Sequence, residues 1–232
     1  MRASGGEDLA MDDSQAAIHE MKQRLRAEAH AARDRQPDKD AVSRRIGQRC
    51  AALPECQSAA TVMLYLDARS EVRTGWLLSA SRARGQRVVV PYCMGDDLGL
   101  FLLESPEELV RGTFGILEPR PALRGLPPKE IPVEQVDLIV VPGVAFDRQG
   151  ARLGHGKGYY DHLLHRARAE TARIALAYEC QMFPRIPSLP HDVPMHAVVT
   201  EAAVYRCGAS AGDSAVAVGR EPREDSLSKE IP

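Results

Sequence analysis

The chain has 232 residues, a formal net charge of −2 at pH 7 and a pI of about 6.4. This length allows one domain with its own core, and the composition does not require a second domain. The balanced charge gives no general attraction to nucleic acid or to an anionic membrane, no apolar run is long enough to cross a bilayer, and the N-terminus lacks the apolar segment of a secretory signal. We therefore expect a cytoplasmic protein without nucleic-acid or membrane partners.

The N-terminal part of the chain predicts a disordered extension followed by two helices. Residues 1–17 are rich in Gly, Ser, Ala and Asp and show no hydrophobic periodicity. Over 18–35 apolar residues recur at helical spacing, and a second such pattern covers 38–53. The other face of the first helix is basic. Lys22 and Arg26 lie one turn apart on it, so they belong either to a solvated face or to a pair that reaches into one site.

The centre of the chain alternates apolar strand patterns with helical ones. Strands are expected at 61–66, 87–92, 98–103, 138–141, 171–178 and 197–205, with helices at 74–84 and from 159 onward. The strand at 98–103 follows a Gly-Asp-Asp turn and can be antiparallel, whereas 112–132 is rich in Pro and Gly and is expected to be irregular. Strands that alternate with helices are typical of an α/β fold with a mostly parallel sheet.

Two residues near the end of the first predicted strand are candidates for ligand binding. Parallel sheets bind ligands at the carboxyl ends of their strands, and Leu66 and Glu71 follow the strand at 61–66. Glu71 can equally be an acid at a helix N-terminus, where the helix dipole favours it.

The stretch 137–164 carries the strongest chemical signal. It consists of an apolar run, then four glycines within 150–158, then a helical pattern. Arg152, His155 and Lys157 are interleaved with the glycines, so the backbone can approach a ligand closely while cations point at it. The following helix would present its N-terminus, which favours an anion. The pattern indicates an anion-binding loop, with a flexible surface loop as the alternative.

The spacing within this loop excludes two common phosphate-binding motifs. Lys157 is followed by Gly158 instead of Ser or Thr, so the loop is not a Walker A motif. The third glycine also falls one position too early for a dinucleotide fingerprint, and Tyr159 occupies the place that glycine should hold.

Cysteine and histidine spacing gives no metal site or disulfide framework. The five cysteines include no C-x-x-C pair, and their number is odd. They are interpreted as buried or incidental thiols, with a catalytic nucleophile as the alternative. His162 and His165 share a helix face but lack a third ligand at matching spacing, which favours solvated side chains.

The stretch 137–164 as a whole resembles the signature of the 5-formyltetrahydrofolate cyclo-ligase family, also called 5,10-methenyltetrahydrofolate synthetase. In that family a DLI-type strand, a PG-x-x-FD turn and an RLG-x-G-x-GYYD loop follow one another, as DLIVVPGVAFD and RLGHGKGYYD do here. The resemblance covers residues 18–206 and leaves outside it 1–17 and the polar tail 207–232, which is expected to be disordered. It implies a single three-layer α/β/α domain, Rossmann-like, with the nucleotide at one end of the sheet.

The resemblance implies an ATP- and Mg-dependent cyclisation of 5-formyltetrahydrofolate to 5,10-methenyltetrahydrofolate, with release of ADP and phosphate. ATP would phosphorylate the formyl oxygen, and N10 would then attack the carbon and expel phosphate. Such a reaction needs positioning and charge stabilisation but no protein nucleophile. The implied partners are 5-formyltetrahydrofolate and ATP, the implied metal is Mg²⁺, and we expect a monomer. The alternatives are a non-catalytic folate- or nucleotide-binding regulator and a sugar-phosphate isomerase or CoA-transferase-like enzyme.

The resemblance also implies roles for individual residues. Lys157 and Arg152 would be catalytic, the lysine as a point charge on the transferred phosphate and the arginine as a fork-shaped donor. The implied ATP-binding residues are Lys22, Arg26, Arg152, Leu153, Gly154, His155, Gly156, Lys157, Gly158, Tyr159 and Tyr160. The implied folate-binding residues are Leu66, Glu71 and Tyr159.

Two carboxylates are implied magnesium ligands, Asp161 and Asp192. From the residue pattern alone, Asp161 is a first-turn helix acid and Asp192 belongs to a turn. The chain departs from the family's pattern at Arg73, where an acidic or polar residue is common, at His155, where tyrosine or arginine occurs, and at His196, where an aspartate is common.

Overall fold

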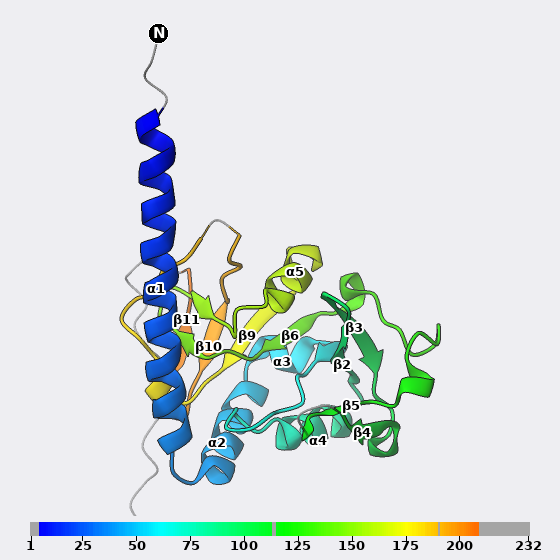
Figure 1. The fold of residues 1–232 in the computed structure, drawn as a ribbon. Helices are drawn as coiled ribbons and strands as arrows, with labels where there is room; N and C mark the ends of the chain where they lie inside the picture. Colours follow the sequence, from blue (N-terminus) through cyan, green and yellow to red (C-terminus); the bar gives the residue numbers. More distant parts are fainter. Residues whose placement is uncertain (1–4, 113–114, 190, 209–232) are drawn as a thin grey trace, which may run out of the picture.

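A seven-stranded sheet forms the centre of the molecule (Figure 1). The structure is a computed structural model that describes residues 5–112, 115–189 and 191–208, with only the backbone described for 5–14. The strands of the sheet are β1 Thr61–Met63, β2 Arg87–Met94, β3 Asp97–Leu102, β6 Leu138–Val141, β9 Ala172–Leu176, β10 Ala197–Val199 and β11 Val204–Arg206. Their order is β11-β10-β9-β6-β1-β2-β3, with five parallel strands in the middle and an antiparallel strand at each edge.

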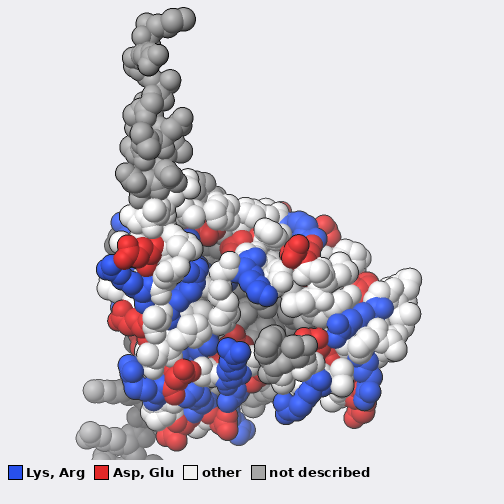
Figure 2. Space-filling model, viewed as in Figure 1, with Lys and Arg blue, Asp and Glu red and all other residues white. Residues whose placement is uncertain are grey.

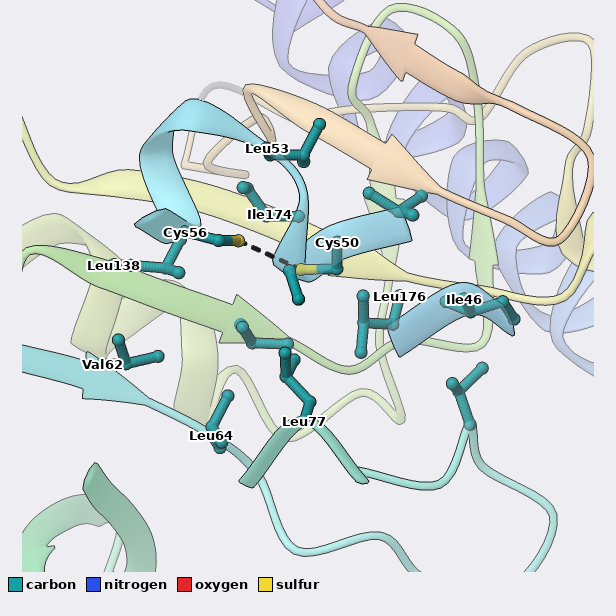
Figure 3. Close-up of a cluster of buried hydrophobic side chains, with 14 of the residues drawn as sticks. Ile46, Cys50, Leu53, Cys56, Val62, Leu64, Leu77, Leu138, Ile174 and Leu176 are labelled. Atoms are coloured by element: carbon teal, nitrogen blue, oxygen red, sulfur yellow. Dashed lines mark hydrogen bonds between the residues drawn. The ribbon is translucent and has the colours of Figure 1, made fainter. Parts of the chain in front are cut away.

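Helices cover both faces of this sheet, and each face has its own apolar core. The helices of one face are α2 Lys39–Ala51, α3 Pro54–Ser58 and α4 Gly75–Ala83, and α5 Tyr159–Arg166 lies on the other face. Successive strand residues point to opposite faces, so Leu138 lies in the same apolar cluster as Ile46 and Leu77 (Figure 3), whereas Ile139 lies in the cluster that contains Leu163. An apolar run buried on both sides is typical of a central parallel strand. The predicted three-layer α/β/α fold is confirmed.

The first helix, α1 Gly5–Arg35, is longer than predicted and extends past the sheet (Figure 1, blue). We expected a disordered extension over 1–17 and a helix only from residue 18, so the predicted start of the helix is wrong. The segment from Glu7 to Ala17 contains Leu, Ala, Met, Glu and Gln but no Gly or Pro, so its propensity supports a helix without an amphipathic pattern. The predicted tail 207–232 lies outside the described residues, except for 207 and 208.

Two predicted strands differ from the observed ones. The segment 197–205 forms a hairpin of β10 and β11 instead of one strand. Thr200 turns the chain, because its Oγ1 accepts the backbone N–H groups of Ala202 and Ala203 at 3.2 and 3.0 Å. The strand expected at 61–66 ends as β1 at Met63, which places Leu66 in the loop that follows.

Smaller elements lie around the sheet. β4 Leu109–Arg111 pairs with β5 Leu117–Pro119, and β7 Ala145–Phe146 pairs with β8 Arg152–Leu153. The 3-10 helices are η1 Pro106–Glu108, η3 Pro121–Leu123, η4 Val133–Gln135 and η5 Glu179–Gln181. The region 112–132, which was expected to be irregular, therefore contains β5 and η3.

The surface of the molecule carries both signs of charge, as the net charge of −2 leads one to expect. Lys and Arg side chains are interspersed with Asp and Glu over the face shown in Figure 2. Among the described helices, none combines the length and the apolar character needed to span a bilayer.

The Cys50 and Cys56 sulfurs lie 3.2 Å apart in the core (Figure 3), and the hydrogen bond to Cys56 together with burial raises the pKa of Cys50. A buried, protonated thiol is a poor nucleophile, so the structure favours a packing role for this pair.

His196 and Arg173 meet at the amino ends of β10 and β9. The backbone N–H of Arg173 donates to Nδ1 of His196 at 3.2 Å, and Nη2 of Arg173 lies 2.6 Å from Nε2. Two donors thus face an imidazole that has one acceptor nitrogen when it is neutral. Burial, and then the charge of Arg173, lowers the pKa of His196.

We expect His196→Asp to raise the free energy of unfolding at pH 7 by up to about 1 kcal/mol, because a carboxylate can accept from both donors. His196→Asn is the matched control, since it keeps the acceptor near the backbone N–H but carries no charge. Urea unfolding at low and high salt measures the difference. Equal stabilities of the two variants would contradict the prediction.

Candidate functional site

A cavity of about 650 Å³ lies beyond the carboxyl end of β6, where Pro142 forms part of its lining. Three segments meet there: α1, the glycine loop at 152–158 with the start of α5, and the loop before Val193. We call it the nucleotide cavity, after the ligand that the family resemblance implies for the residues around it. It is lined by every predicted ATP-binding residue and both predicted magnesium ligands: Lys22, Arg26, Arg152, Leu153, Gly154, His155, Gly156, Lys157, Gly158, Tyr159, Tyr160, Asp161 and Asp192.

The glycine loop has the backbone that its sequence predicts. Gly156 and Gly158 have φ values of 99° and 72°, a left-handed conformation that other residues rarely adopt. Gly158 is the residue before α5, and its carbonyl accepts the N–H of His162 at 3.0 Å, which forms the first turn of that helix. The strand, the loop and the helix therefore follow one another as expected from the stretch 137–164.

Two cations of α1 reach into the nucleotide cavity. Arg26 donates from Nε to the carbonyl of Gly154 at 2.9 Å, which fixes the glycine loop against α1. Lys22, one turn earlier, is only 9% exposed and lies 2.7 Å from Asp192. Of the two interpretations of this basic pair, the structure supports the pair that reaches into one site.

Ion pairs hold the carboxylates of the cavity. Nη2 of Arg152 lies 2.9 Å from Oδ1 of Asp161, and the arginine is almost completely buried. Burial opposes the ionisation of Asp192, but the hydrogen bonds from Lys22 and from the Leu189 backbone lower its pKa overall. Nε of Arg152 is buried without a hydrogen-bond partner among the described residues. A buried donor without a partner costs free energy, so this guanidinium would gain from a further acceptor in its surroundings.

The two aspartates are suited to a hard divalent cation. The backbone N–H of Val193, next to Asp192, lies 3.5 Å from Oδ1 of Asp161, so the segment that carries Asp192 contacts Asp161, and both aspartates line the same cavity. The ion pairs use Oδ1 of Asp161 and Oδ2 of Asp192, and Oδ1 of Asp192 lies 3.9 Å from Nε2 of His191, beyond hydrogen-bond distance; one oxygen of each carboxylate could therefore turn to a metal. Within the described part of the chain, no cluster of three or more His, Cys, Asp or Glu side chains could enclose a metal. Mg²⁺ typically binds one or two carboxylates together with phosphate oxygens and water, and two carboxylates meet that requirement.

The predicted folate residues lie outside this cavity, with the exception of Tyr159. Leu66 lines a second cavity of about 400 Å³, together with Arg69, Arg73 and Leu109. Glu71 lies between the two cavities: its Oε1 is 3.7 Å from Nε2 of His155, and its Oε2 accepts the N–H of Ala68, another residue that lines the second cavity. The structure therefore divides the predicted site into two adjoining cavities.

Two residues near the site, His30 and Arg33, were missed by the sequence analysis as candidates. Arg33 is 2% exposed and donates to Oγ of Ser70 at 3.1 Å and to the carbonyl of Gly143 at 3.3 Å. Helical spacing could have identified them, because residues 22, 26, 30 and 33 lie on one face of α1.

The buried surroundings of His30 predict a pH-dependent stability. Burial, and then the positive charge of Arg33, lowers the pKa of His30. Between the ordinary histidine pKa of about 6.5 and this lower value, the unfolded chain binds more protons than the folded one. The free energy of unfolding should therefore fall as the pH is lowered from 7.5 to 5.5.

His30→Gln should make this decline shallower, whereas the same change at the exposed His162 should leave it as in the wild type. Urea unfolding at pH 7.5, 6.5 and 5.5 gives the three slopes. Parallel pH profiles for the wild type and His30→Gln would contradict the assignment.

Comparison with known proteins identifies the family of the chain. Residues 16–201 match the model of the 5-formyltetrahydrofolate cyclo-ligase family. The 5-formyltetrahydrofolate cyclo-ligase of Mycolicibacterium smegmatis is 38% identical over 62% of this chain and 74% of its own length. The 5-formyltetrahydrofolate cyclo-ligase of Escherichia coli (strain K12) is 32% identical over 71% of this chain and 90% of its own length.

A solved structure shows the same architecture. The NMR structure of Aquifex aeolicus 5,10-methenyltetrahydrofolate synthetase is 33% identical, has a TM-score of 0.71 and covers 84% of this chain and 96% of that one. The family match, the related sequences and the shared fold all extend over most of the chain. The chain therefore belongs to the 5-formyltetrahydrofolate cyclo-ligase family, and it is an enzyme of the ligase class.

Proposed function

We propose that this enzyme converts 5-formyltetrahydrofolate to 5,10-methenyltetrahydrofolate and hydrolyses ATP to ADP and phosphate in the same reaction, with Mg²⁺ as the metal. The observation that carries the proposal is the nucleotide cavity, which is lined by a glycine loop, four cationic side chains and two carboxylates. The four cations are Lys22, Arg26, Arg152 and Lys157. A second cavity adjoins it across Glu71.

ATP would bind with its phosphates against the glycine loop and the start of α5. Two of the cations, Lys22 and Arg152, are paired with Asp192 and Asp161 in the structure. Phosphate oxygens can replace these carboxylates as partners of the cations, and the carboxylates are then free to hold Mg²⁺. Mg²⁺ bound there would neutralise part of the phosphate charge. The two ion pairs compensate two of the four cations, so the cavity keeps an excess of positive charge that favours a polyanion.

The second cavity is the proposed site of the folate. Leu66 gives it an apolar wall, Arg69 supplies positive charge for a carboxylate, and Glu71, at its border, can accept hydrogen bonds from ring N–H groups. Tyr159 would meet the end of the folate that faces the nucleotide. In this arrangement the formyl group would point toward Lys157 and the phosphates.

The chemistry then follows from positioning. The formyl oxygen attacks the terminal phosphorus and ADP leaves; N10 attacks the activated carbon, phosphate departs with the former formyl oxygen, and N10 loses its proton. Lys157 and Arg152 would stabilise the charge on the transferred group. No step requires a protein nucleophile, which agrees with the buried, protonated Cys50.

The test is a turnover assay with purified protein, ATP, Mg²⁺ and 5-formyltetrahydrofolate, followed by the absorbance of the methenyl product. We expect product only when all three are present, together with an equal amount of ADP. A protein that forms no product at saturating concentrations of all three would overturn the proposal.

No observation favours a non-catalytic regulator. Arg73, where the chain departs from the family's pattern, has its guanidinium 3.3 Å from Asp67 and 3.4 Å from Asp40. These contacts give Arg73 a role in holding the loop after β1, which is compatible with catalysis.

A further inference from the structure

His155 belongs to the glycine loop and lines the nucleotide cavity, yet one of its contacts, Glu71, leads to the second cavity. Its ring centroid is 5.3 Å from that of His30, with the rings tilted by 32°, and its Nε2 is 3.7 Å from Oε1 of Glu71. The His155 side chain is 53% exposed, so it has room to turn. It is thus a side chain at the border of both cavities.

Glu71 is fixed at this border with one oxygen left for a further donor. Its Oε2 accepts the N–H of Ala68 at 2.9 Å, and its carbonyl accepts the hydroxyl of Tyr178 at 3.2 Å. The side chain is only 13% exposed. Because Ala68 lines the second cavity, a ligand bound there lies close to this carboxylate.

The contact between His155 and Glu71 is weak enough to be exchanged. A separation of 3.7 Å is longer than a hydrogen bond, and a contact of this kind at a half-exposed imidazole stabilises little. A donor in the second cavity that forms a hydrogen bond to Oε1 would therefore replace the imidazole.

The His155 ring has a second neighbour, His30, whose position is fixed by Arg33. His30 packs against its ring, and Nη2 of Arg33 lies 3.4 Å from Nδ1 of His30. Arg33 is itself buried and bonded to Ser70 and to Gly143. When Glu71 is taken by a ligand, the imidazole cannot move toward α1, and the open direction is the nucleotide cavity that it already lines.

We propose that His155 is a catalytic residue whose imidazole changes partners: it contacts Glu71 when the second cavity is empty, and it donates its N–H to a phosphate oxygen when a folate occupies that cavity. This inference rests on the proposed function for the identity of both ligands. Folate binding in the second cavity would release His155 from Glu71, and the released imidazole would add one donor to the phosphate site.

The kinetic test separates this role from a structural one. His155→Ala should lower kcat about 10- to 100-fold, the expected effect of losing one hydrogen bond to a charged oxygen. The KM for 5-formyltetrahydrofolate should not rise, because a competitor for Glu71 is gone. His155→Gln, which keeps an N–H donor, should recover most of kcat. If His155→Ala retains the wild-type kcat, or if its KM rises while kcat is unchanged, the proposal is overturned.

A binding test needs no turnover. The imidazole resonance of His155 is followed by NMR while 5-formyltetrahydrofolate is added without ATP. It should shift in the wild type but not in Glu71→Gln, whereas the resonance of His196, at the amino ends of the strands, should stay in place. A His155 resonance that stays in place in the wild type would overturn the exchange. A wild type that shows the shift without turnover would instead overturn the proposed function.

Discussion

Replacing Lys157 by alanine is expected to lower kcat by about a hundredfold or more and to leave the free energy of unfolding within about 0.5 kcal/mol of the wild type. The side chain is exposed in the nucleotide cavity, and its ammonium lies 5.6 Å from the centroid of the Tyr159 ring. Little packing is therefore lost, whereas a positive charge is removed from the place where the phosphate is proposed to be transferred. Steady-state kinetics and urea unfolding on the same preparation measure both effects.

Two variants serve as controls for Lys157→Ala. Lys157→Arg keeps the charge but changes its shape, so it should retain more activity than the alanine variant. Arg45→Ala removes an exposed cation from α2, outside the nucleotide cavity, and should change neither kcat nor stability. If Lys157→Ala loses stability in proportion to activity, the lysine has a structural role instead.

Replacing Gly150 by alanine is expected to cost more than about 3 kcal/mol of stability and to reduce activity as well. Gly150 has a φ of 91°, and an added Cβ would lie 2.5 Å from the carbonyl oxygen of Met195 and 2.9 Å from Cys207. The carbonyl oxygen belongs to the backbone and cannot rotate away. Relief would require the turn before Arg152 to separate from the segment that follows Asp192, and both residues line the nucleotide cavity.

Gly85→Ala is the matched control for the steric part of this effect. Gly85 has a φ of 75°, but no described atom lies within 4 Å of the Cβ position. It therefore carries the left-handed strain without the clash, and about 1 kcal/mol is expected. Thermal and urea unfolding of the two variants should differ by the cost of the clash. Similar losses at the two positions would show that Gly150 is constrained by its backbone conformation alone.

The sequence by itself determined the elements whose signals are local. The run at 138–141 is apolar at every position and therefore predicted a central strand, and the glycines up to Gly158 allow the left-handed turn that begins α5. The cations and carboxylates of the nucleotide cavity were likewise named from their positions, since the resemblance to the family depends on the order of residues along the chain. These features need no knowledge of distant contacts.

Only the tertiary structure decided which of these residues meet. The pair Lys22 and Asp192 joins residues that are 170 positions apart, and Arg26 reaches Gly154 across 128 positions. The helical pattern of α1 showed a basic face, but only the docking of that face on the glycine loop distinguishes buried cations from solvated ones. The separation of Leu66 from the nucleotide cavity was hidden for the same reason: a strand pattern cannot show that β1 ends at Met63 and that Glu71 then forms the border between two cavities. Hydrophobic periodicity records whether a side chain is buried, whereas partners come from the packing of segments far apart in the chain.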